Sequence, residues 1–261
     1  MPNPIATQLP PLAATIAPLA GEVTDALDDL VRMGYRAVQL SATQVGTRPR
    51  DLDASGRRGL ASHLRRLGLV CAGFDLWIPS SHFVDSAFVD RAIDAVSQCT
   101  TLAASLGGCP ISLVLPERTD GNDGRLREVR DALSSCAQRD GVWIADHGID
   151  AATGRAGMGG ASALGIGIDP PTILAAGREL NEVISKRGAQ IVSARIVDLL
   201  RSGMRGPPEE PGESRLDLLA YAAALAVIPL RTSPVADARQ WTDPRLGLSR
   251  TLERWTADPR V

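Results

Sequence analysis

Histidine is scarce in this chain, and the charges of the two signs almost cancel. The 261 residues include 3 histidines. So few imidazoles exclude chemistry that needs a histidine-rich cluster, such as multi-metal cleavage of nucleic acids. There are 28 basic and 30 acidic side chains, and the formal net charge is -2. This balance removes the usual electrostatic reason to expect a nucleic-acid or membrane partner, and we expect neither.

Long hydrophobic runs and paired cysteines are also missing. No run reaches the roughly 18 apolar residues that a membrane-spanning helix needs. The first residues lack the basic start of a secretory signal, and prolines interrupt their apolar stretch, so we expect no signal peptide. The cysteines form no CxxC pair and are interpreted as small buried side chains in a reducing compartment: Cys71, Cys99, Cys109 and Cys136. Together these features predict a cytoplasmic protein.

What the sequence does have is an alternation of apolar strands and amphipathic helices. Helical spacing predicts helices at residues 23–33, 53–67, 89–106, 126–137, 178–187, 216–226 and 245–256. Between them we expect strands at residues 37–40, 69–74, 111–115, 142–145, 164–168, 191–197 and 227–230. Repeated alternation of this kind is typical of a parallel sheet with helical crossovers.

The number of strand–helix units favours a barrel. Eight such units in about 250 residues correspond to a (β/α)8 TIM barrel, and the irregular segment 1–20 is available to supply the eighth strand. We therefore predict one barrel domain over residues 1–261. The alternative is a doubly wound open sheet, but no GxGxxG motif follows the first strand to support it.

Two connections depart from the regular pattern. Residues 147–163 contain five glycines, each of which disfavours helix by ~1 kcal/mol relative to alanine, so a mobile loop or a very short helix is expected there. Residues 202–215 contain three prolines and predict a second long loop. Both connections follow strand ends, so both are expected at the C-terminal face, where barrel enzymes keep their active sites.

The sequence resembles the xylose-isomerase-like barrels, a superfamily of sugar phosphate isomerases and epimerases. Four segments carry the resemblance: Leu27-x-x-Leu30-x-x-Met33-Gly34-Tyr35-x-Ala37-Val38-Gln39-Leu40, Asp169-Pro170-x-x-Ile173-Leu174-x-x-Gly177, Arg195-Ile196-Val197-Asp198, and Pro211-Gly212-Glu213 with Leu216-Asp217. They cover roughly residues 22–232. The resemblance implies the barrel fold and a site at the ends of successive strands.

In that family a glutamate, an aspartate, a histidine and a second glutamate typically hold a divalent metal. Carried over residue by residue, the first position falls on Asp146 and the second on Asp169. The third falls on Arg195, which has no lone pair to offer a metal, and the fourth falls near Arg231. We therefore expect no cofactor and regard a divalent metal as doubtful. The hypothesis is that Arg195, with Arg231, replaces the metal charge and pairs with Asp146 and Asp169. The alternative is a shifted register in which Asp198 takes a ligand position.

Further residues near expected strand ends are candidates for binding substrate. His147 would act near neutral pH as an acid or base, or else be a loop residue bonded to backbone, and strand alternation predicts that it points away from Asp146. His82 follows the expected strand at residues 69–74, and Glu117 follows the expected strand at residues 111–115. Asp75 directly follows the expected strand at residues 69–74 and is a weaker candidate.

The expected reaction follows from the resemblance. It implies a sugar or sugar-phosphate isomerase or epimerase that moves a proton next to a carbonyl, with Asp146, Asp169 and Arg195 as catalytic residues. Arg231, Arg201 and Arg205 favour an anionic ligand, so the expected partner is a polyol, a sugar or an anionic sugar derivative. A non-catalytic relative that binds a carbohydrate, a small anion or a protein partner is the alternative. A homodimer remains open.

Overall fold

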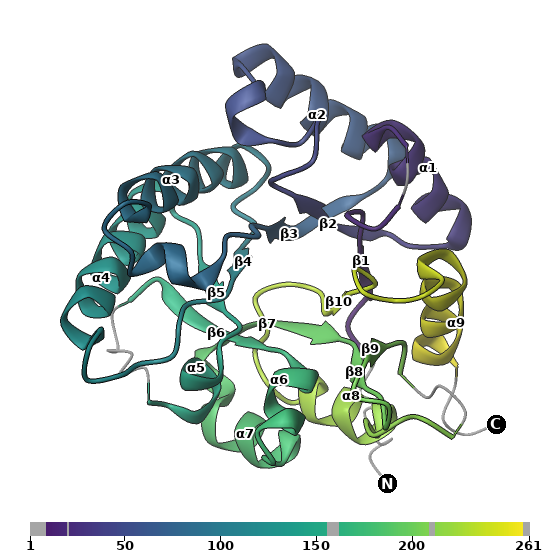
Figure 1. The fold of residues 1–261 in the computed structure, drawn as a ribbon. Helices are drawn as coiled ribbons and strands as arrows, with labels where there is room; N and C mark the ends of the chain where they lie inside the picture. The colour runs from purple at the N-terminus through teal and green to yellow at the C-terminus, as the bar shows by residue number, and fades with distance from the viewer. Residues whose placement is uncertain (1–8, 20, 156–161, 209–211, 258–261) are drawn as a thin grey trace, which may run out of the picture.

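The chain folds into a closed barrel of strands surrounded by helices (Figure 1). The computed structural model describes residues 9–19, 21–155, 162–208 and 212–257. The parallel strands of the barrel follow the order β1-β10-β7-β6-β5-β4-β3-β2. They are β1 (Ala13–Thr15), β2 (Ala37–Ser41), β3 (Val70–Asp75), β4 (Ile111–Leu113), β5 (Ile144–Asp146), β6 (Leu164–Ile168), β7 (Ile191–Ile196) and β10 (Val235–Ala236). The predicted (β/α)8 fold is confirmed, and the segment before residue 21 supplies the eighth strand.

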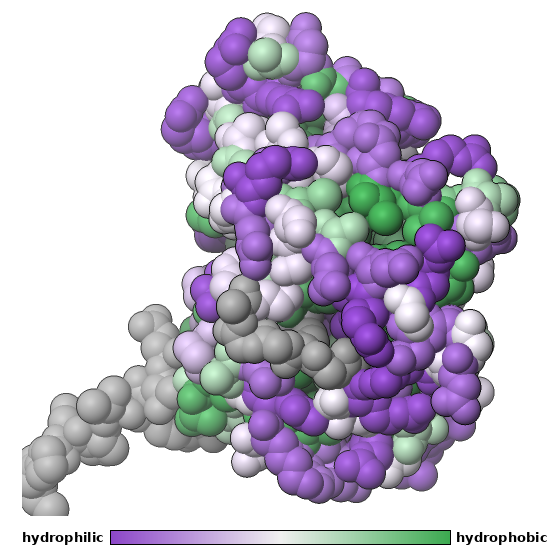
Figure 2. Space-filling model, turned by 90° about the vertical axis from the view of Figure 1, so that its left-hand side faces the viewer, coloured by the Kyte–Doolittle hydropathy of each residue, from purple (hydrophilic) through white to green (hydrophobic). Residues whose placement is uncertain are grey.

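The helices form the outer layer. They are α1 (Val23–Met33), α2 (Ala54–Leu67), α3 (Val89–Ser105), α4 (Asp123–Asp140), α5 (Ile149–Thr153), α6 (Pro170–Ala175), α7 (Leu180–Arg187), α8 (Leu218–Ala226) and α9 (Pro244–Thr256), with 3-10 turns at Pro49–Asp51, Ser80–Phe83 and Gly188–Gln190. In α4 the buried residues recur at helical spacing: Leu126, Val129, Leu133 and Ala137. The face of the molecule over α3 and α4 is mainly hydrophilic (Figure 2). Among the described residues, no helix has the length and apolarity to cross a membrane.

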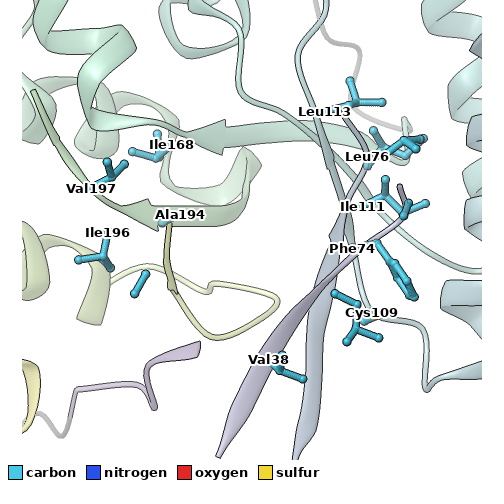
Figure 3. Close-up of a cluster of buried hydrophobic side chains, with 14 of the residues drawn as sticks. Val38, Phe74, Leu76, Cys109, Ile111, Leu113, Ile168, Ala194, Ile196 and Val197 are labelled. Carbon is cyan, nitrogen blue, oxygen red and sulfur yellow. The ribbon is translucent and has the colours of Figure 1, made fainter. Parts of the chain in front are cut away.

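Strand alternation sorts the side chains of the barrel into two sets. One set packs between the strands and the helices, and Figure 3 shows part of it: Val38, Phe74, Ile111, Leu113, Ile168, Ala194 and Ile196. The other set points into the barrel. Arg195 on β7 contacts Asp75 on β3, and because these strands are not neighbours, this contact crosses the barrel interior.

The last barrel strand is not where the sequence predicted it. Residues 227–230 form a turn after α8, with Val227 77% exposed, and the strand is β10 at Val235–Ala236. The apolar run is interrupted by Pro229, which lacks the amide that a strand donates. The sequence placed residues 231–234 after the C-terminal end of the last strand. In the structure they precede the last strand, β10, at its N-terminal end.

The two irregular connections have different outcomes. Residues 149–153 form the short helix α5, which ends at Gly154 with φ 84°, as the glycine content predicted. The glycines at 157, 159 and 160 lie outside the described residues. The connection after β7 contains an antiparallel hairpin of β8 (Asp198–Leu199) and β9 (Arg205–Gly206), which the sequence did not predict.

Candidate active site

Three aspartates and three arginines meet at the C-terminal ends of four barrel strands. We call them the arginine–aspartate cluster: Asp75 ends β3, Asp169 follows β6, Arg195 lies in β7, Arg205 lies in β9, and Asp237 and Arg239 follow β10. Parallel strands bring their carboxyl ends to one edge, and this is why residues so far apart in sequence converge. The cluster therefore stands where barrel enzymes place their reacting groups.

Arg195 is the centre of the cluster. Its Nη1 lies 3.3 Å from Oδ1 of Asp169, and its Nη2 lies 3.3 Å from Oδ1 of Asp75. Its Nε lies 3.4 Å from Oδ2 of Asp237. The side chain is 5% exposed. One planar guanidinium thus faces a carboxylate from each of three strands, a geometry that lysine cannot reproduce.

Two outer arginines complete the charge balance. Arg205 donates from Nη1 and Nη2 to the two oxygens of Asp169, at 3.0 and 2.5 Å. Arg239 donates from Nε and Nη2 to Asp237, at 2.7 and 2.5 Å, and from Nη1 to Asp75 at 2.6 Å. Both outer arginines are partly exposed. With three positive and three negative groups, the cluster is electrically neutral when all six are ionised.

The three carboxyl groups differ in their pKa values. Burial opposes ionisation of Asp169, but Arg195 and Arg205 outweigh it and hold the pKa of that carboxyl far below its usual range. Burial also opposes ionisation of Asp237, but Arg239 and Arg195 lower its pKa to about 2. For Asp75 burial prevails over Arg239 and Arg195, so its pKa is raised. Asp75 is therefore the member of the cluster that most readily takes up a proton.

A cavity of about 570 Å³ opens on the cluster. Its polar part consists of Asp75, Arg195, Arg205, Asp237, Arg239 and Gln240, and its remaining wall consists of residues 76–80 with Leu113 and Val114. Trp77 lines this wall and is 67% exposed. The volume lies in the range of small-molecule sites, and an apolar wall beside a few charged groups is their usual character.

His147 follows β5 and is held in the barrel interior by residues of β4 and β7. Its Nε2 lies 3.1 Å from Oγ of Ser112 and 3.2 Å from Oγ of Ser193. Gly167 makes room for the ring, since a Cβ there would approach it to 2.4 Å. Burial, and then the charge of Arg195, lower the pKa of His147 well below its usual value, so the ring is neutral. Its Nδ1 has no hydrogen-bond partner among the described residues.

The predicted catalytic residues divide into two groups. Asp169 and Arg195 meet as expected, whereas Asp146 does not join them, and the expected pairing of Arg195 with Asp146 is wrong. Asp146 faces outward and bonds Arg130 of α4 at 2.9 Å. The amides of Leu115 and Gly148 also donate to it, at 3.1 and 2.9 Å. Strand alternation turns the two side chains to opposite sides, as the sequence predicted, but it is His147 that points inward and Asp146 that points outward.

Arg231 is also displaced from its expected place. Because the true strand begins at Val235, Arg231 lies before the strand, at the opposite end of the barrel from the cluster. Its guanidinium stacks over the ring of Trp143, 3.7 Å from the centroid. Trp143 itself immediately precedes β5. The expected role of Arg231 beside Arg195 is therefore wrong.

The other candidates lie outside the cavity lining. His82 stacks on Phe88, with ring centroids 4.4 Å apart. Glu117 is exposed in the loop after β4. Asp198 is buried and accepts from Oγ of Ser214 at 2.7 Å and from the amide of Arg215 at 2.8 Å, so it fastens the connection after the hairpin. These contacts do not support the alternative in which a shifted register gives Asp198 a ligand position.

Two members of the cluster were missed from the sequence. Asp237 and Arg239 follow β10, and the misplaced strand at 227–230 hid them. A usable signal was present, since Val235-Ala236-Asp237 repeats the pattern of an apolar strand that runs into an aspartate, as at Asp75, Asp146 and Asp169. A strand of two residues is too short for this pattern to stand out.

The metal that the family resemblance implies does not fit the residues present. The guanidinium of Arg195 lies between the carboxylates and cannot coordinate a cation, and each carboxylate is already bonded to an arginine. Among the described residues, no group of three or more His, Cys, Asp or Glu side chains is arranged to hold a metal ion. The positive charge at this position therefore belongs to the protein itself.

Comparison with known proteins shows which solved structures share this fold. No family model matches the chain, and no curated protein matches it in sequence. Among solved structures, the xylose isomerase domain protein from Planctomyces limnophilus has a TM-score of 0.71 at 18% identity, over 95% of this chain and 96% of that one. The 3-keto-D-glucoside 4-epimerase from E. coli gives 0.71 at 13% identity, over 94% and 98%. A sugar phosphate isomerase/epimerase from Parabacteroides distasonis gives 0.69 at 11% identity, over 98% and 96%.

These comparisons identify the class of barrel. The chain has the fold of the xylose-isomerase-like sugar isomerases and epimerases over nearly its whole length, and the resemblance inferred from sequence is confirmed at the level of the fold. Identity of this degree shows the fold and not the reaction. The function has to be argued from the cluster.

Proposed function

We propose that this protein binds a small sugar or an anionic sugar derivative in the cavity and moves a proton at the carbon next to its carbonyl, as an isomerase or epimerase does, with arginine charge in place of a metal. The observation that carries the proposal is the convergence of Arg195, Arg205 and Arg239 on a 570 Å³ cavity together with a carboxyl group of raised pKa.

The proposed chemistry assigns a role to each kind of group. Asp75 removes the proton from the carbon beside the carbonyl, and the electron pair moves onto the carbonyl oxygen to form an enediolate. Arg195 and Arg239 lie beside Asp75 and stabilise the negative charge that develops on that oxygen. If the proton returns to the former carbonyl carbon, while the proton of the adjacent hydroxyl passes to the former carbonyl oxygen, the sugar is isomerised. If a proton returns to the opposite face of the original carbon, the sugar is epimerised.

The remaining groups support this chemistry. Asp169 and Asp237, with lowered pKa values, stay ionised and hold the three arginines in place. Trp77 offers an exposed aromatic face on the cavity wall against which a sugar ring packs. Substrate recognition thus comes from a charged floor and an apolar wall.

The test is hydrogen exchange at the substrate carbon. Purified protein is incubated in D2O with a panel of free and phosphorylated ketoses, and NMR follows loss of the proton beside the carbonyl. Exchange is expected with at least one sugar, and Asp75→Asn is expected to abolish it while circular dichroism shows the fold retained. Asp146→Asn is the matched control, because Asp146 faces α4, and it should keep the exchange. If the Asp75→Asn variant still exchanged the proton, Asp75 would not be the base.

A second candidate is a non-catalytic sugar- or anion-binding protein. One observation favours it: every carboxylate of the cluster is already bonded to an arginine. A carboxylate that acts as a base would have to give up part of this ion pair. The same panel separates the two candidates. Ligand-induced NMR shifts at cavity residues without any exchange would support binding alone.

A further inference from the structure

Two cysteines lie together at the end of the barrel opposite the cluster. Cys71 is the second residue of β3, and Cys109 lies two residues before β4, the neighbouring strand. Their Sγ atoms are 3.3 Å apart. The sequence separation is large, so only the fold brings them into contact. Neither residue has a part in the proposed function.

The surroundings of the two sulfurs are unequal. Cys109 is 6% exposed, and its Sγ otherwise contacts the carbonyl of Ala103 at 3.9 Å. Cys71 is only partly buried, and its Sγ contacts the carbonyl of Gly73 at 3.7 Å. The hydrogen bond with Cys71 and then burial raise the pKa of Cys109, so Cys109 remains a thiol. Cys71 is thus the sulfur that a small oxidant meets first.

We propose that Cys71 and Cys109 are a reversible oxidation site that closes to a disulfide when a peroxide reaches Cys71. The sulfurs must approach from 3.3 Å to the roughly 2.05 Å of a disulfide, which is a small movement of two side chains already in contact. The bulge in β3 beside Cys71, where the register with β2 skips Ala72, means that this part of the strand is already irregular.

The reaction balances without a further reagent. The Cys71 thiol gives up its proton, the thiolate attacks one oxygen of the peroxide, and the O–O bond breaks. A sulfenic acid forms, and the leaving hydroxide takes up the released proton as water. The sulfur of Cys109 then attacks the Cys71 sulfur, the S–O bond breaks, and the leaving hydroxide takes the Cys109 proton as a second water. Two thiols are oxidised and one hydrogen peroxide is reduced to two waters. A dithiol reductant reverses the change.

The disulfide would join two adjacent strands at their N-terminal ends. Asp75 lies at the other end of β3, so the cluster and its cavity stay in place. The link closes a long chain segment that includes all of α3, and closing such a segment restricts the unfolded chain. Oxidation therefore raises stability and protects Cys71 from irreversible oxidation.

The experiment counts thiols in the folded protein. Native protein is treated with hydrogen peroxide, the oxidant is removed, and free thiols are counted after unfolding. The reduced chain has four cysteines, and the treated chain is expected to have two free thiols and a mass lower by about 2 Da. Peptide mapping should show the Cys71–Cys109 link, Tm should rise by about 5–10 °C, and dithiothreitol should reverse both.

The controls separate this pair from the other cysteines. Cys71→Ser and Cys109→Ser are each expected to form no internal disulfide, whereas Cys136→Ser, on the partly buried cysteine of α4, should still form the link. Wild-type protein that retains four thiols, a link between other cysteines, or Cys71 oxidised to a sulfinic acid beside a free Cys109 would each overturn the proposal. The readouts involve no sugar, so they are independent of the proposed function.

Discussion

At the scale of the residue, one guanidinium decides the character of the site. Arg195 lies among three carboxylates and is nearly excluded from solvent. Such a group is costly to bury alone, and its partners are equally costly to bury without it. The three strands that carry Asp75, Asp169 and Asp237 are therefore joined electrostatically through a single side chain.

The first prediction concerns that side chain. Arg195→Ala is expected to lower the free energy of unfolding at pH 7 by about 3–5 kcal/mol, because three buried carboxylates lose a shared counter-charge. Arg195→Lys should be intermediate, since it keeps the charge but not the planar fork. Urea unfolding measures both. Arg65→Ala, on an exposed face of α2, is the control and should change stability by less than about 0.5 kcal/mol. A loss for Arg195→Ala as small as that of the control would contradict the central role of Arg195.

The second prediction concerns pH. A carboxyl group whose folded pKa is lowered stabilises the fold above its unfolded pKa, and this contribution disappears as the pH falls through the folded pKa. For Asp237, with a pKa lowered to about 2, the window runs from about pH 4 down to about pH 2. Asp237→Asn should therefore cost about 2 kcal/mol at pH 7 and progressively less toward pH 2.

Urea unfolding of wild type and Asp237→Asn at pH 7, 4 and 2.5 checks this window. Asp120→Asn, in an exposed loop, is the comparison and should follow the wild type at each pH. A stability difference for Asp237→Asn that stays constant from pH 7 to pH 2.5 would show that ionisation of Asp237 is not its source.

At the scale of the element, glycine in β6 makes space for the side chain that follows β5. The His147 ring lies directly against Gly167, and a Cβ at that position would come within 2.4 Å of it. Neither strand alone requires a glycine there. The requirement arises because parallel neighbours in a narrow barrel turn side chains of adjacent strands into the same interior.

The third prediction tests this packing. Gly167→Ala is expected to destabilise the fold by about 1–3 kcal/mol, because the added methyl collides with a buried ring. Gly59→Ala, in the middle of α2 with no atom within 4 Å of its Cβ position, should instead stabilise by up to about 1 kcal/mol. Thermal and urea unfolding measure both.

A double variant identifies the cause. In the His147→Ala background, Gly167→Ala should cost less than about 1 kcal/mol, because the ring that it displaces is gone. Equal costs of Gly167→Ala in the two backgrounds would show that His147 is not the residue in conflict.

At the scale of the whole molecule, a barrel fold shared with solved structures carries a mouth lined by arginine–aspartate pairs. Several solved structures that share the fold are named as sugar isomerases or epimerases, and their backbones match this chain over nearly its whole length. Among the described residues, the arginine–aspartate cluster at the mouth of the barrel has three arginines and three aspartates, all buried or partly buried. A neutral ion-pair network thus closes the end of the barrel, where it holds four strands together.

The fourth prediction follows from that network. Mn²⁺, Mg²⁺ or Zn²⁺ at millimolar concentration is expected to raise Tm by less than 1–2 °C, roughly the resolution of the measurement, because a ligand stabilises only in proportion to its binding. Isothermal titration calorimetry should show no stoichiometric binding, and chelation should leave Tm unchanged. Tight binding of one metal ion per chain, if the Asp169→Asn substitution abolished it, would contradict the inference that Arg195 supplies the positive charge at this position.

Sequence reasoning reached the fold and about half of the site. Helical spacing and short apolar strands located most elements, and Asp169 with Arg195 were correctly placed at neighbouring strand ends. Asp146 was misassigned because a strand end continues for one or two residues, and which of Asp146 and His147 turns inward depends on the register with β4 and β6. Asp237 and Arg239 were missed because β10 is only two residues long.

The amino-acid order by itself determined the alternation of strands and helices, and so the barrel, because hydrophobic periodicity is a local property. It also determined that position 195 holds an arginine, whose guanidinium cannot coordinate a cation. Which charges face that arginine was decided only by the tertiary structure. Asp75, Asp169 and Asp237 lie on different strands, and barrel closure together with strand register sets the distances between them. The pairing of β3 with β4 brings Cys71 to Cys109, a contact that no spacing in the sequence predicts.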